Sequence, residues 1–261
     1  MGNLITAKGF ETCWRYAELF KQGIIVTVLL ALFTVVIGFM LGILLAIARM
    51  SDIRPFRFLG LDKNGRLRSK GVLLTISKFN PLSFLATCYV EVIRSTPVLV
   101  QIMIIYFGVF RLVQLPNVTL LGFLKLQRFL PGVVALGMNS GAYLCEIIRS
   151  GIQSIDGGQT EAARSLGLSQ SKTMIHIILP QALRNILPAI ANEFVVIIKE
   201  SAIAYTIGVP DLMAAVNDVR GAASIIMEPL LVATAVYFCL CFPTSKLIAY
   251  FERRMSRGNV R

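Results

Sequence analysis

The chain has 261 residues, of which 56% are hydrophobic and only 15% are charged, and its mean hydropathy is +0.72. Soluble domains carry about 25% charged residues, so this composition excludes an ordinary soluble domain and indicates a membrane protein. The formal net charge of +12 would suit nucleic-acid binding, but the basic residues flank apolar stretches and form no single patch, which excludes that class.

The cysteine and histidine content supports neither a metal site nor a disulfide framework. Two of the five cysteines are two positions apart without a second such pair, and the one histidine, His176, has no neighbouring ligand set. We therefore expect small apolar roles for the cysteines, a structural role for His176, and no metal. The cysteines are Cys13, Cys88, Cys145, Cys239 and Cys241.

Residues 1–22 are predicted to form an amphipathic segment on the external surface of the membrane that the chain crosses. They include four charged residues after position 10, and the apolar run that follows is too long for a signal peptide, so no cleavable signal is expected. One transmembrane domain is predicted over 23–254, followed by a basic cytoplasmic tail over 255–261.

Five apolar stretches predict transmembrane helices. The first is the clearest, because residues 22–48 carry no charge and exceed the roughly 20 residues needed to cross a bilayer. Gly38 and Gly42 within it form a small-xxx-small pair, which permits close contact with another helix. The predicted spans are about 23–48, 96–111, 131–149, 184–208 and 229–248.

The stretch 49–94, between the first two spans, is predicted to be a cytoplasmic loop. It holds nine Lys and Arg residues against three acidic residues, and cytoplasmic loops are enriched in positive charge. Gly60–Gly71 within it is predicted to be a polar turn, to which no role is assigned.

The segment Tyr89–Pro97 leads from this loop into the second span. Glu91 and Arg94 are three residues apart, a spacing that lets them pair on one helix face. Ser95 or Thr96 is expected to cap a new helix with Pro97 in its first turn.

The third span contains the polar residues Asn139, Ser140, Tyr143 and Glu146. Their spacing places Asn139, Tyr143 and Glu146 on one helix face. Polar groups in a span usually face a bundle interior or a cavity, so these residues either join helices or line a solute path.

The fourth span contains Glu193, Lys199 and Glu200. A helix from Arg184 to Glu200 rises roughly 24 Å, which places Lys199 and Glu200 in the outer half of a core about 30 Å thick. A neighbouring anion and cation would suit a zwitterionic amino acid. The alternative, that both residues pair with neighbouring helices, is equally open.

Between the third and fourth spans, the loop 156–180 is predicted to form two short helices with a sharp bend. Asp156 is expected to cap the first helix, with Gln159 reaching back to it. Gly167 supplies a left-handed residue that ends this helix, and Ser169 caps the next. Such a loop would protrude from the membrane, where a protein partner could bind it.

The charge distribution orients the chain. With five spans and the N-terminus outside, eighteen of the 26 Lys and Arg residues lie in cytoplasmic segments, which include the loop 156–180 and the tail. The opposite orientation would violate the positive-inside rule.

The loop resembles the E-A-A-x3-G-x9-I-x-L-P motif of ATP-binding cassette (ABC) importer permeases. The matching residues are Glu161, Ala162, Ala163, Gly167, Ile177, Leu179 and Pro180. The resemblance implies an all-α, type I importer permease-like bundle, in which this coupling loop docks on an ATPase subunit and transmits its closure to the membrane.

Other segments resemble the polar amino acid branch of these permeases. Tyr89–Pro97 is similar to its Y-x-E-x-x-R-[GS]-T-P segment, and Ile207–Leu212 to its I-G-V-x-[DE]-L segment. Lys199–Ser201 is similar to the start of its K-[DE]-[ST]-S-L segment, although Ala202-Ile203 replaces Ser-Leu. The candidates for the solute path are therefore Asn139, Ser140, Tyr143, Lys199, Glu200 and Ser201.

The resemblance implies the permease subunit of an ATP-driven importer in a bacterial plasma or inner membrane. Its solute would be a polar amino acid delivered by an external solute-binding protein. The expected partners are two ABC ATPase subunits and a second permease chain, alike or different. The chain lacks a G-x-x-x-x-G-K-[ST] loop, so ATP is expected to bind to the ATPase subunits and no cofactor to this chain.

No set of nucleophile, base and orienting residue suggests an enzyme.

Three alternatives to an amino acid importer remain at this point. An ion-driven secondary transporter would work without ATP, although five spans are few for that class. A membrane scaffold would tolerate loss of Glu200 without loss of transport. A permease for a different small solute would keep the coupling loop.

Overall fold

The computed structural model describes residues 5–56, 72–113 and 115–256. The predicted turn Gly60–Gly71 and the end of the predicted basic tail, 257–261, lie outside the described residues. The described elements are α1 (Ala7–Arg15), α2 (Ala17–Met50), α3 (Val72–Lys78), α4 (Pro81–Arg94), α5 (Val98–Met103), the π-helix η2 (Ile104–Val109), β1 (Thr119–Leu120), β2 (Leu124–Lys125), α6 (Leu126–Gln153), α7 (Gly157–Ser165), α8 (Gln170–Thr173), the π-helix η3 (Met174–Ile178), α9 (Leu179–Glu200), the 3-10 helix η4 (Ser201–Ile207), α10 (Leu212–Ala223) and α11 (Met227–Ser256).

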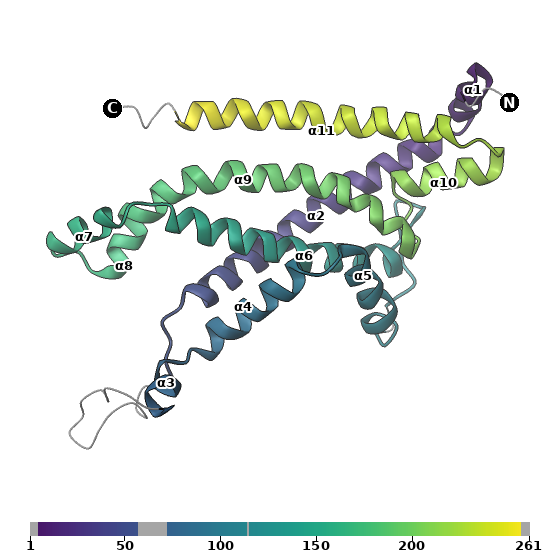
Figure 1. Cartoon of the computed structure of the whole chain (residues 1–261). Helices are drawn as coiled ribbons and strands as arrows, with labels where there is room; N and C mark the ends of the chain where they lie inside the picture. The colour runs from purple at the N-terminus through teal and green to yellow at the C-terminus, as the bar shows by residue number, and fades with distance from the viewer. Residues whose placement is uncertain (1–4, 57–71, 114, 257–261) are drawn as a thin grey trace.

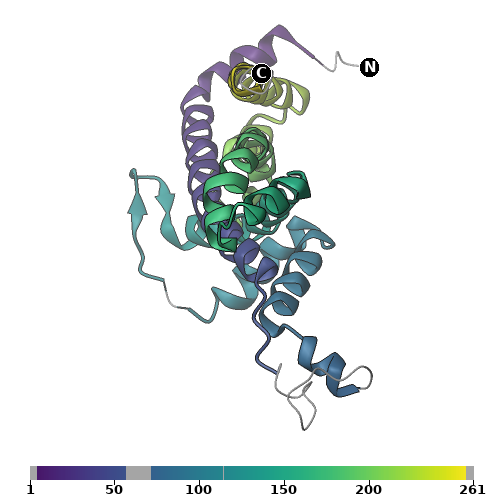
Figure 2. The same cartoon turned by 90° about the vertical axis from the view of Figure 1, so that its left-hand side faces the viewer.

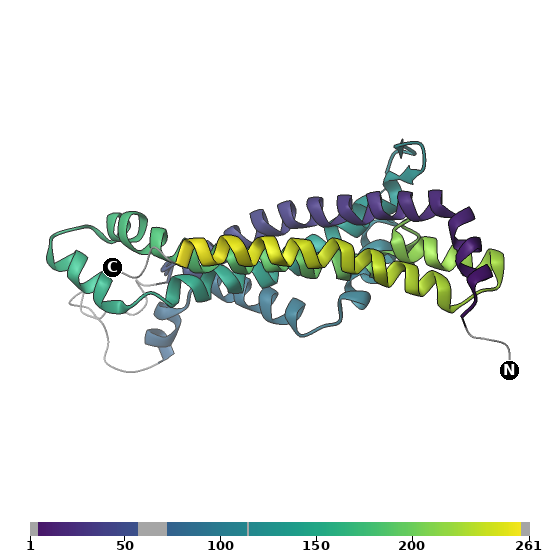
Figure 3. The ribbon, with the colours of Figure 1, turned by 90° about the horizontal axis from the view of Figure 1, so that it is seen from above.

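The long helices lie along one another and give the molecule an elongated shape (Figure 1). Helix α1 lies at one end, beside α10 and the start of α11, and α7 and α8 protrude at the opposite end. The view from above shows the same separation (Figure 3). The small β1–β2 hairpin extends sideways from the bundle (Figure 2), with Thr119 paired to Lys125.

Helices α2 and α6 meet at a contact that only glycine permits. A Cβ at Gly38 would lie 2.7 Å from the Ser140 hydroxyl oxygen, and a Cβ at Gly42 would lie 2.8 Å from the Leu144 Cβ. A Cβ does not pack this closely against carbon or oxygen, so a larger residue at either position would push the helices apart. The close contact predicted from the small-xxx-small pair is confirmed.

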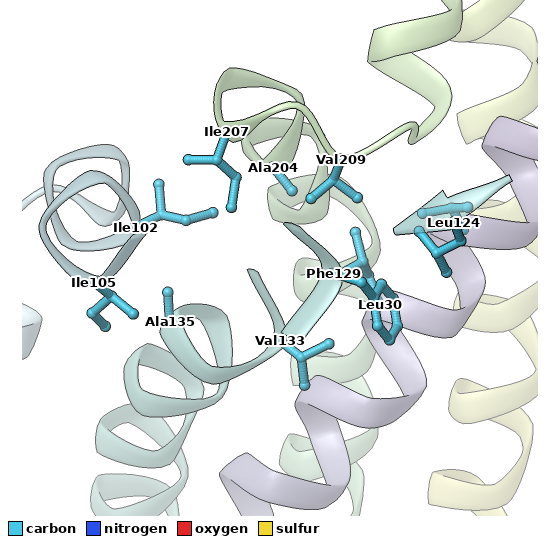
Figure 4. Packing of buried hydrophobic residues seen from close by; sticks show 11 residues of the cluster. Leu30, Ile102, Ile105, Leu124, Phe129, Val133, Ala135, Ala204, Ile207 and Val209 are labelled. Carbon is cyan, nitrogen blue, oxygen red and sulfur yellow. The ribbon is translucent and has the colours of Figure 1, made fainter. Parts of the chain in front are cut away.

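The main apolar core lies towards the end of the bundle that holds α10. There α2, α5, η2, the beginning of α6 and η4 pack together (Figure 4). Leu30 of α2 and Ile102 of α5 are fully buried in this cluster, and Val209 joins it from the turn after η4. Helix α11 packs against α9, and most of its apolar surface is exposed on the single chain.

Two helices in the described part of the chain are long and apolar enough to cross a membrane on their own, α2 and the Met227–Arg254 part of α11. The pair Pro81–Arg94 and Val98–Val109 would be a third span if counted together. Helices α6 and α9 contain more polar residues, such as Glu146 and Glu193, and are not in this group. The number of five spans therefore remains a prediction.

The stretch 49–94 was predicted to be a loop, but part of it is helical and packs on the bundle. Helix α4 occupies its second half and packs on α2 and α6 through Ala86 and Val90, which are buried. Asn80 begins this helix, since its side-chain oxygen accepts a hydrogen bond from the Ser83 N–H at 3.0 Å. This helix was not predicted because the excess of Lys and Arg indicated a cytoplasmic loop for the whole stretch.

The predicted cap of the following helix is also wrong. Ser95 ends α4, and Pro97 itself occupies the N-cap position of α5, so neither Ser95 nor Thr96 caps that helix. A residue before proline is disfavoured in the helical region, which explains the break at this point. The two helical segments are bent by 107° at the break.

Candidate coupling loop and solute-path residues

The loop between α6 and α9 has the two-helix shape predicted for it. The Asp156 Oδ1 accepts a hydrogen bond from the Gly158 N–H at 2.6 Å and so caps α7. The Ser169 Oγ accepts one from the Lys172 N–H at 3.4 Å at the start of α8. Both predicted caps are confirmed. They satisfy N–H groups at the starts of helices that extend away from the bundle (Figure 1).

Gly167 forms the bend between these two helices. Its φ of +83° is left-handed, as predicted. The Gly167 N–H donates to the Arg164 carbonyl at 3.0 Å, and the Leu168 N–H donates to the Ala163 carbonyl at 3.1 Å. This pair of bonds is the Schellman motif, which satisfies carbonyls at the end of a helix. The loop shape therefore depends on one left-handed residue.

The predicted coupling residues between 161 and 167 divide between an exposed and a buried face. Glu161, Ala162 and Gly167 are exposed, whereas Ala163 is buried against the rest of the loop. Leu166, which the motif leaves unspecified, is 84% exposed at the tip of the loop. The exposed face thus offers a partner an acidic group, Glu161, and one large apolar side chain, Leu166.

Ile177, Leu179 and Pro180 connect the loop to α9. Ile177 is half-buried in η3, and Leu179 lines an apolar cavity of about 590 Å³ between α2, α6 and α9. Pro180 is exposed and has no N–H to donate to the carbonyl of His176, so a regular α-helix cannot continue through this point. The π-helical turn η3 ends at Ile178, two residues before Pro180. These residues hold the base of the loop, and α7 presents its outer face.

An ion-pair cluster joins α2, α4 and α6. Arg49 lies at its centre, because its Nη1 is 2.7 Å from the Glu146 Oε2 and its Nη2 is 3.3 Å from the Glu91 Oε1. Arg149 adds a further pair to Glu146. The predicted pairing of Glu91 with Arg94 is therefore corrected, since Glu91 pairs with Arg49 and Arg94 lies 5.4 Å from the centre of the Tyr143 ring.

The two ion pairs of Arg49 are expected to differ in strength. In double-mutant cycles, the Arg49→Met and Glu146→Met pair should show a coupling energy of about 1–3 kcal/mol, because both side chains are mostly buried. The Arg49→Met and Glu91→Gln pair should show less than about 1 kcal/mol, because 58% of the Glu91 side chain is exposed. Thermal unfolding in detergent measures both. Equal coupling energies would contradict the difference.

A buried amide network holds the bend between α4 and α5. The Gln101 Nε2 donates to the Ile93 carbonyl at 2.7 Å and to both oxygens of Thr96. Its Oε1 accepts from the Asn139 Nδ2 of α6 at 2.9 Å. The sequence left two roles open for Asn139, joining helices or lining a solute path. This bond joins α6 to α5 and so supports the first role. Sequence reasoning gave Gln101 no role, because its partners become neighbours only through the bend.

Ser140 and Tyr143 face different neighbours. Ser140 is buried beside Gly38 of α2 and Glu193 of α9. Tyr143 is 37% exposed and turns towards α4, where Arg94 covers its ring. Asn139 and Tyr143 therefore share the face that meets α4 and α5, and Ser140 belongs to the contact between α2, α6 and α9.

Lys199, Glu200 and Ser201 lie where α9 ends and η4 begins. Lys199 is exposed and Glu200 is half-buried, whereas Ser201 is buried and donates its hydroxyl to the Ile198 carbonyl at 2.8 Å. The Glu200 carboxylate is close enough to Glu193 to interact electrostatically with it. The six solute-path candidates thus form two groups, one on α6 and one at the end of α9, and they do not converge on one point.

Comparison with known proteins adds sequence and structural relatives. Residues 70–257 match the family described as binding-protein-dependent transport system inner membrane component. The arginine transport system permease protein ArtQ of Bacillus subtilis (strain 168) is 36% identical over 238 residues, which cover 91% of this chain and 93% of ArtQ. The probable glutamine ABC transporter permease protein GlnM of the same organism is 37% identical over 186 residues, which cover 71% of this chain and 82% of GlnM.

A solved structure shares the fold. The crystal structure of an amino acid ABC transporter with histidines contains a chain that is 38% identical to this one. The TM-score is 0.76, and the match covers 94% of this chain and 98% of that chain.

Proposed function

Because the chain belongs to the family of binding-protein-dependent transport system inner membrane components, we propose that it works as the membrane-spanning permease subunit of an ATP-driven importer whose solute is a polar amino acid. It spans the membrane several times, and its cellular site is the bacterial plasma or inner membrane. It belongs to a family of transport subunits and not of enzymes.

The coupling loop is the observation on which this proposal depends most. Helix α7 is capped at its start, closed by a Schellman motif at its end, and extends beyond the bundle. The exposed face of α7 and its C-cap includes Glu161, Ala162 and Leu166, and α8, on the other side of the bend, continues through η3 into the long helix α9. A force applied to α7 would therefore pass through the bend at Gly167 to α8, which continues through η3 into α9 without a break.

The mechanism is a shift between two states of the assembly. Two ATPase subunits bind the coupling loops of two permease chains, and ATP draws the ATPase subunits together. This movement favours an outward-open cavity, and ATP hydrolysis restores the inward-open one. ATP and the loaded solute-binding protein change the populations only because each binds one state more tightly than the other.

The relatives support an amino acid as the solute. The two permeases above are named for arginine and glutamine, and the solved relative is an amino acid transporter with histidines. Arginine, glutamine and histidine each carry an α-ammonium and an α-carboxylate group. Lys199 and Glu200 supply opposite charges at the end of α9, where they would replace part of the water around such a zwitterion.

Transport by the reconstituted assembly tests the function. The permease, its ATPase and its solute-binding protein are placed in sealed vesicles, with ATP inside the compartment that the ATPase faces and radiolabelled amino acids on the other side. We expect uptake that requires ATP and the binding protein. Uptake that follows an ion gradient and continues without ATP would contradict the proposal and indicate a secondary transporter.

Glu200→Gln is expected to weaken transport without weakening assembly. If the carboxylate binds the solute ammonium, losing one charged hydrogen bond of about 1.5–3 kcal/mol raises the KM for uptake by roughly 10–100-fold. The matched control is Glu18→Gln, since Glu18 is exposed in the first turn of α2 and pairs only weakly with Lys21 at 3.7 Å. An unchanged KM and an unchanged maximal rate for Glu200→Gln would remove Glu200 from the solute path.

A further inference from the structure

Helix α1 has one face that packs on the rest of the chain. Gly9 and Cys13, four residues apart, are buried there. Cys13 joins a cluster with Phe20 of α2 and Val216 of α10. This face fixes α1 against the end of the bundle that lies opposite the coupling loop (Figures 1 and 3).

Glu228 secures this packing from the first turn of α11. Its Oε1 accepts hydrogen bonds from the Thr6 N–H at 3.0 Å and from the Thr6 hydroxyl at 3.1 Å, and only 3% of Glu228 is exposed. The Thr6 hydroxyl oxygen also accepts from the Gly9 N–H at 3.0 Å, which caps α1. A Cβ at Gly9 would overlap the carboxylate. These contacts fix the rotation of α1 about its own axis.

This fixed rotation leaves an apolar stripe without a partner on the chain. Phe10 and Trp14 follow one another at i and i+4 beside the buried face, and Trp14 is 82% exposed. Lys8 and Arg15 lie on the remaining side of the helix and are exposed. Helix α1 therefore has three faces, one packed on protein, one apolar and one polar.

The location of the stripe identifies its partner. Helix α1 is joined through Tyr16 to α2, which is apolar and long enough to cross a membrane. The stripe thus lies where the apolar part of α2 begins, at the level of the lipid headgroups. Tryptophan is enriched at this level, and helices with an apolar face and a cationic face lie in the plane of the interface.

We propose that α1 is an interfacial membrane anchor, with Phe10 and Trp14 between the upper acyl chains of the outer leaflet, Lys8 and Arg15 among the headgroups, and Glu228 holding the helix in this orientation. The anchor links the outer end of α11 to the membrane surface. The inference requires the chain to lie in a bilayer, and it does not depend on the solute or on the ATPase.

The chain supplies its own probe, because Trp14 is its one tryptophan. The full assembly is reconstituted in vesicles of phosphatidylethanolamine and phosphatidylglycerol. Separate preparations contain phosphatidylcholine brominated either near the headgroup end or near the methyl end of the acyl chain. The same assembly with Trp14→Phe gives the emission of the partner subunits, and the difference between the two spectra is the emission of Trp14.

We expect Trp14 to emit at shorter wavelength than tryptophan in water. Its emission should be quenched more strongly by bromine near the headgroup end than near the methyl end, and little by iodide in solution. Thr6→Val removes the hydroxyl that binds Glu228 and caps α1, and it should increase quenching by iodide. This variant changes only an exposed residue at the start of the chain, so the bundle itself should remain folded.

Two results would overturn the placement of Trp14 in lipid, and a third would overturn the role of Thr6 in orienting α1. Strong quenching by iodide with none by brominated lipid would place Trp14 in water. Protection from both iodide and brominated lipid would place it against another protein, either a second permease chain or the solute-binding protein. Identical quenching in Thr6→Val and in the unmodified chain would show that the Thr6 hydroxyl, which bonds to Glu228 and caps α1, does not orient the helix.

Discussion

Gly167→Val is expected to reduce binding of the ATPase subunit by about 5–30-fold, because a β-branched residue is strained in the left-handed conformation by roughly 1–2 kcal/mol. Gly167 has a φ of +83°, and a Cβ there would meet nothing within 4 Å. The effect must therefore come from the backbone and not from a clash. Co-purification of the ATPase from the membrane measures it, and uptake should fall in parallel.

Gly167→Asn is the matched control. Asparagine tolerates the left-handed region much better than valine does, so this variant should keep most of the bound ATPase. Equal loss in both variants would mean that the glycine surface itself is the contact. No loss in either variant would mean that the shape of this loop does not control docking.

Gly42→Leu is expected to push α2 away from α6, so that the permease no longer forms a stable assembly with its partner subunits. Even the single methyl group of Gly42→Ala would lie 2.8 Å from the Leu144 Cβ and 3.1 Å from the Cys145 backbone nitrogen. Overpacking of this kind costs about 1–3 kcal/mol, which corresponds to a decrease in Tm of roughly 2–12 °C for Gly42→Ala. The leucine side chain is far larger and cannot be accommodated by small shifts.

Gly108→Ala is the control for that experiment, because a Cβ at Gly108 meets nothing within 4 Å. Gly108 is exposed in the π-helix η2, whereas Gly42 is buried in α2, so the two variants make the same change with and without a neighbouring helix in contact. Thermal unfolding in detergent compares them. If Gly42→Ala were as stable as Gly108→Ala, the close contact between α2 and α6 would not be required.

Local signals in the sequence predicted the shape of the loop between α6 and α9 closely. The capping residues Asp156 and Ser169 and the left-handed Gly167 act within a few positions of themselves, so their effects can be read from neighbouring residues. The contact of Gly38 and Gly42 was predicted for a similar reason, since small residues four apart make one flat helix face.

Features that depend on distant segments could not be predicted in this way. Arg49 pairs with Glu146 across 97 residues, and Asn139 binds Gln101 across 38. Helix α4 was hidden because its stretch is basic overall, although its own buried face contains Ala86 and Val90. Spacing showed that Asn139 and Tyr143 share a face, but only the packing shows that this face meets α4 and α5.

The central claim, that this chain works with an ABC ATPase, is tested most directly by purifying the chain from its native membrane. Mass spectrometry then identifies the proteins that accompany it. We predict that an ABC ATPase subunit co-purifies with the unmodified chain and is largely lost with Gly167→Val. The same experiment would show whether a second, different permease accompanies the chain. A chain that purifies alone, yet moves solute across vesicles without ATP, would contradict the account.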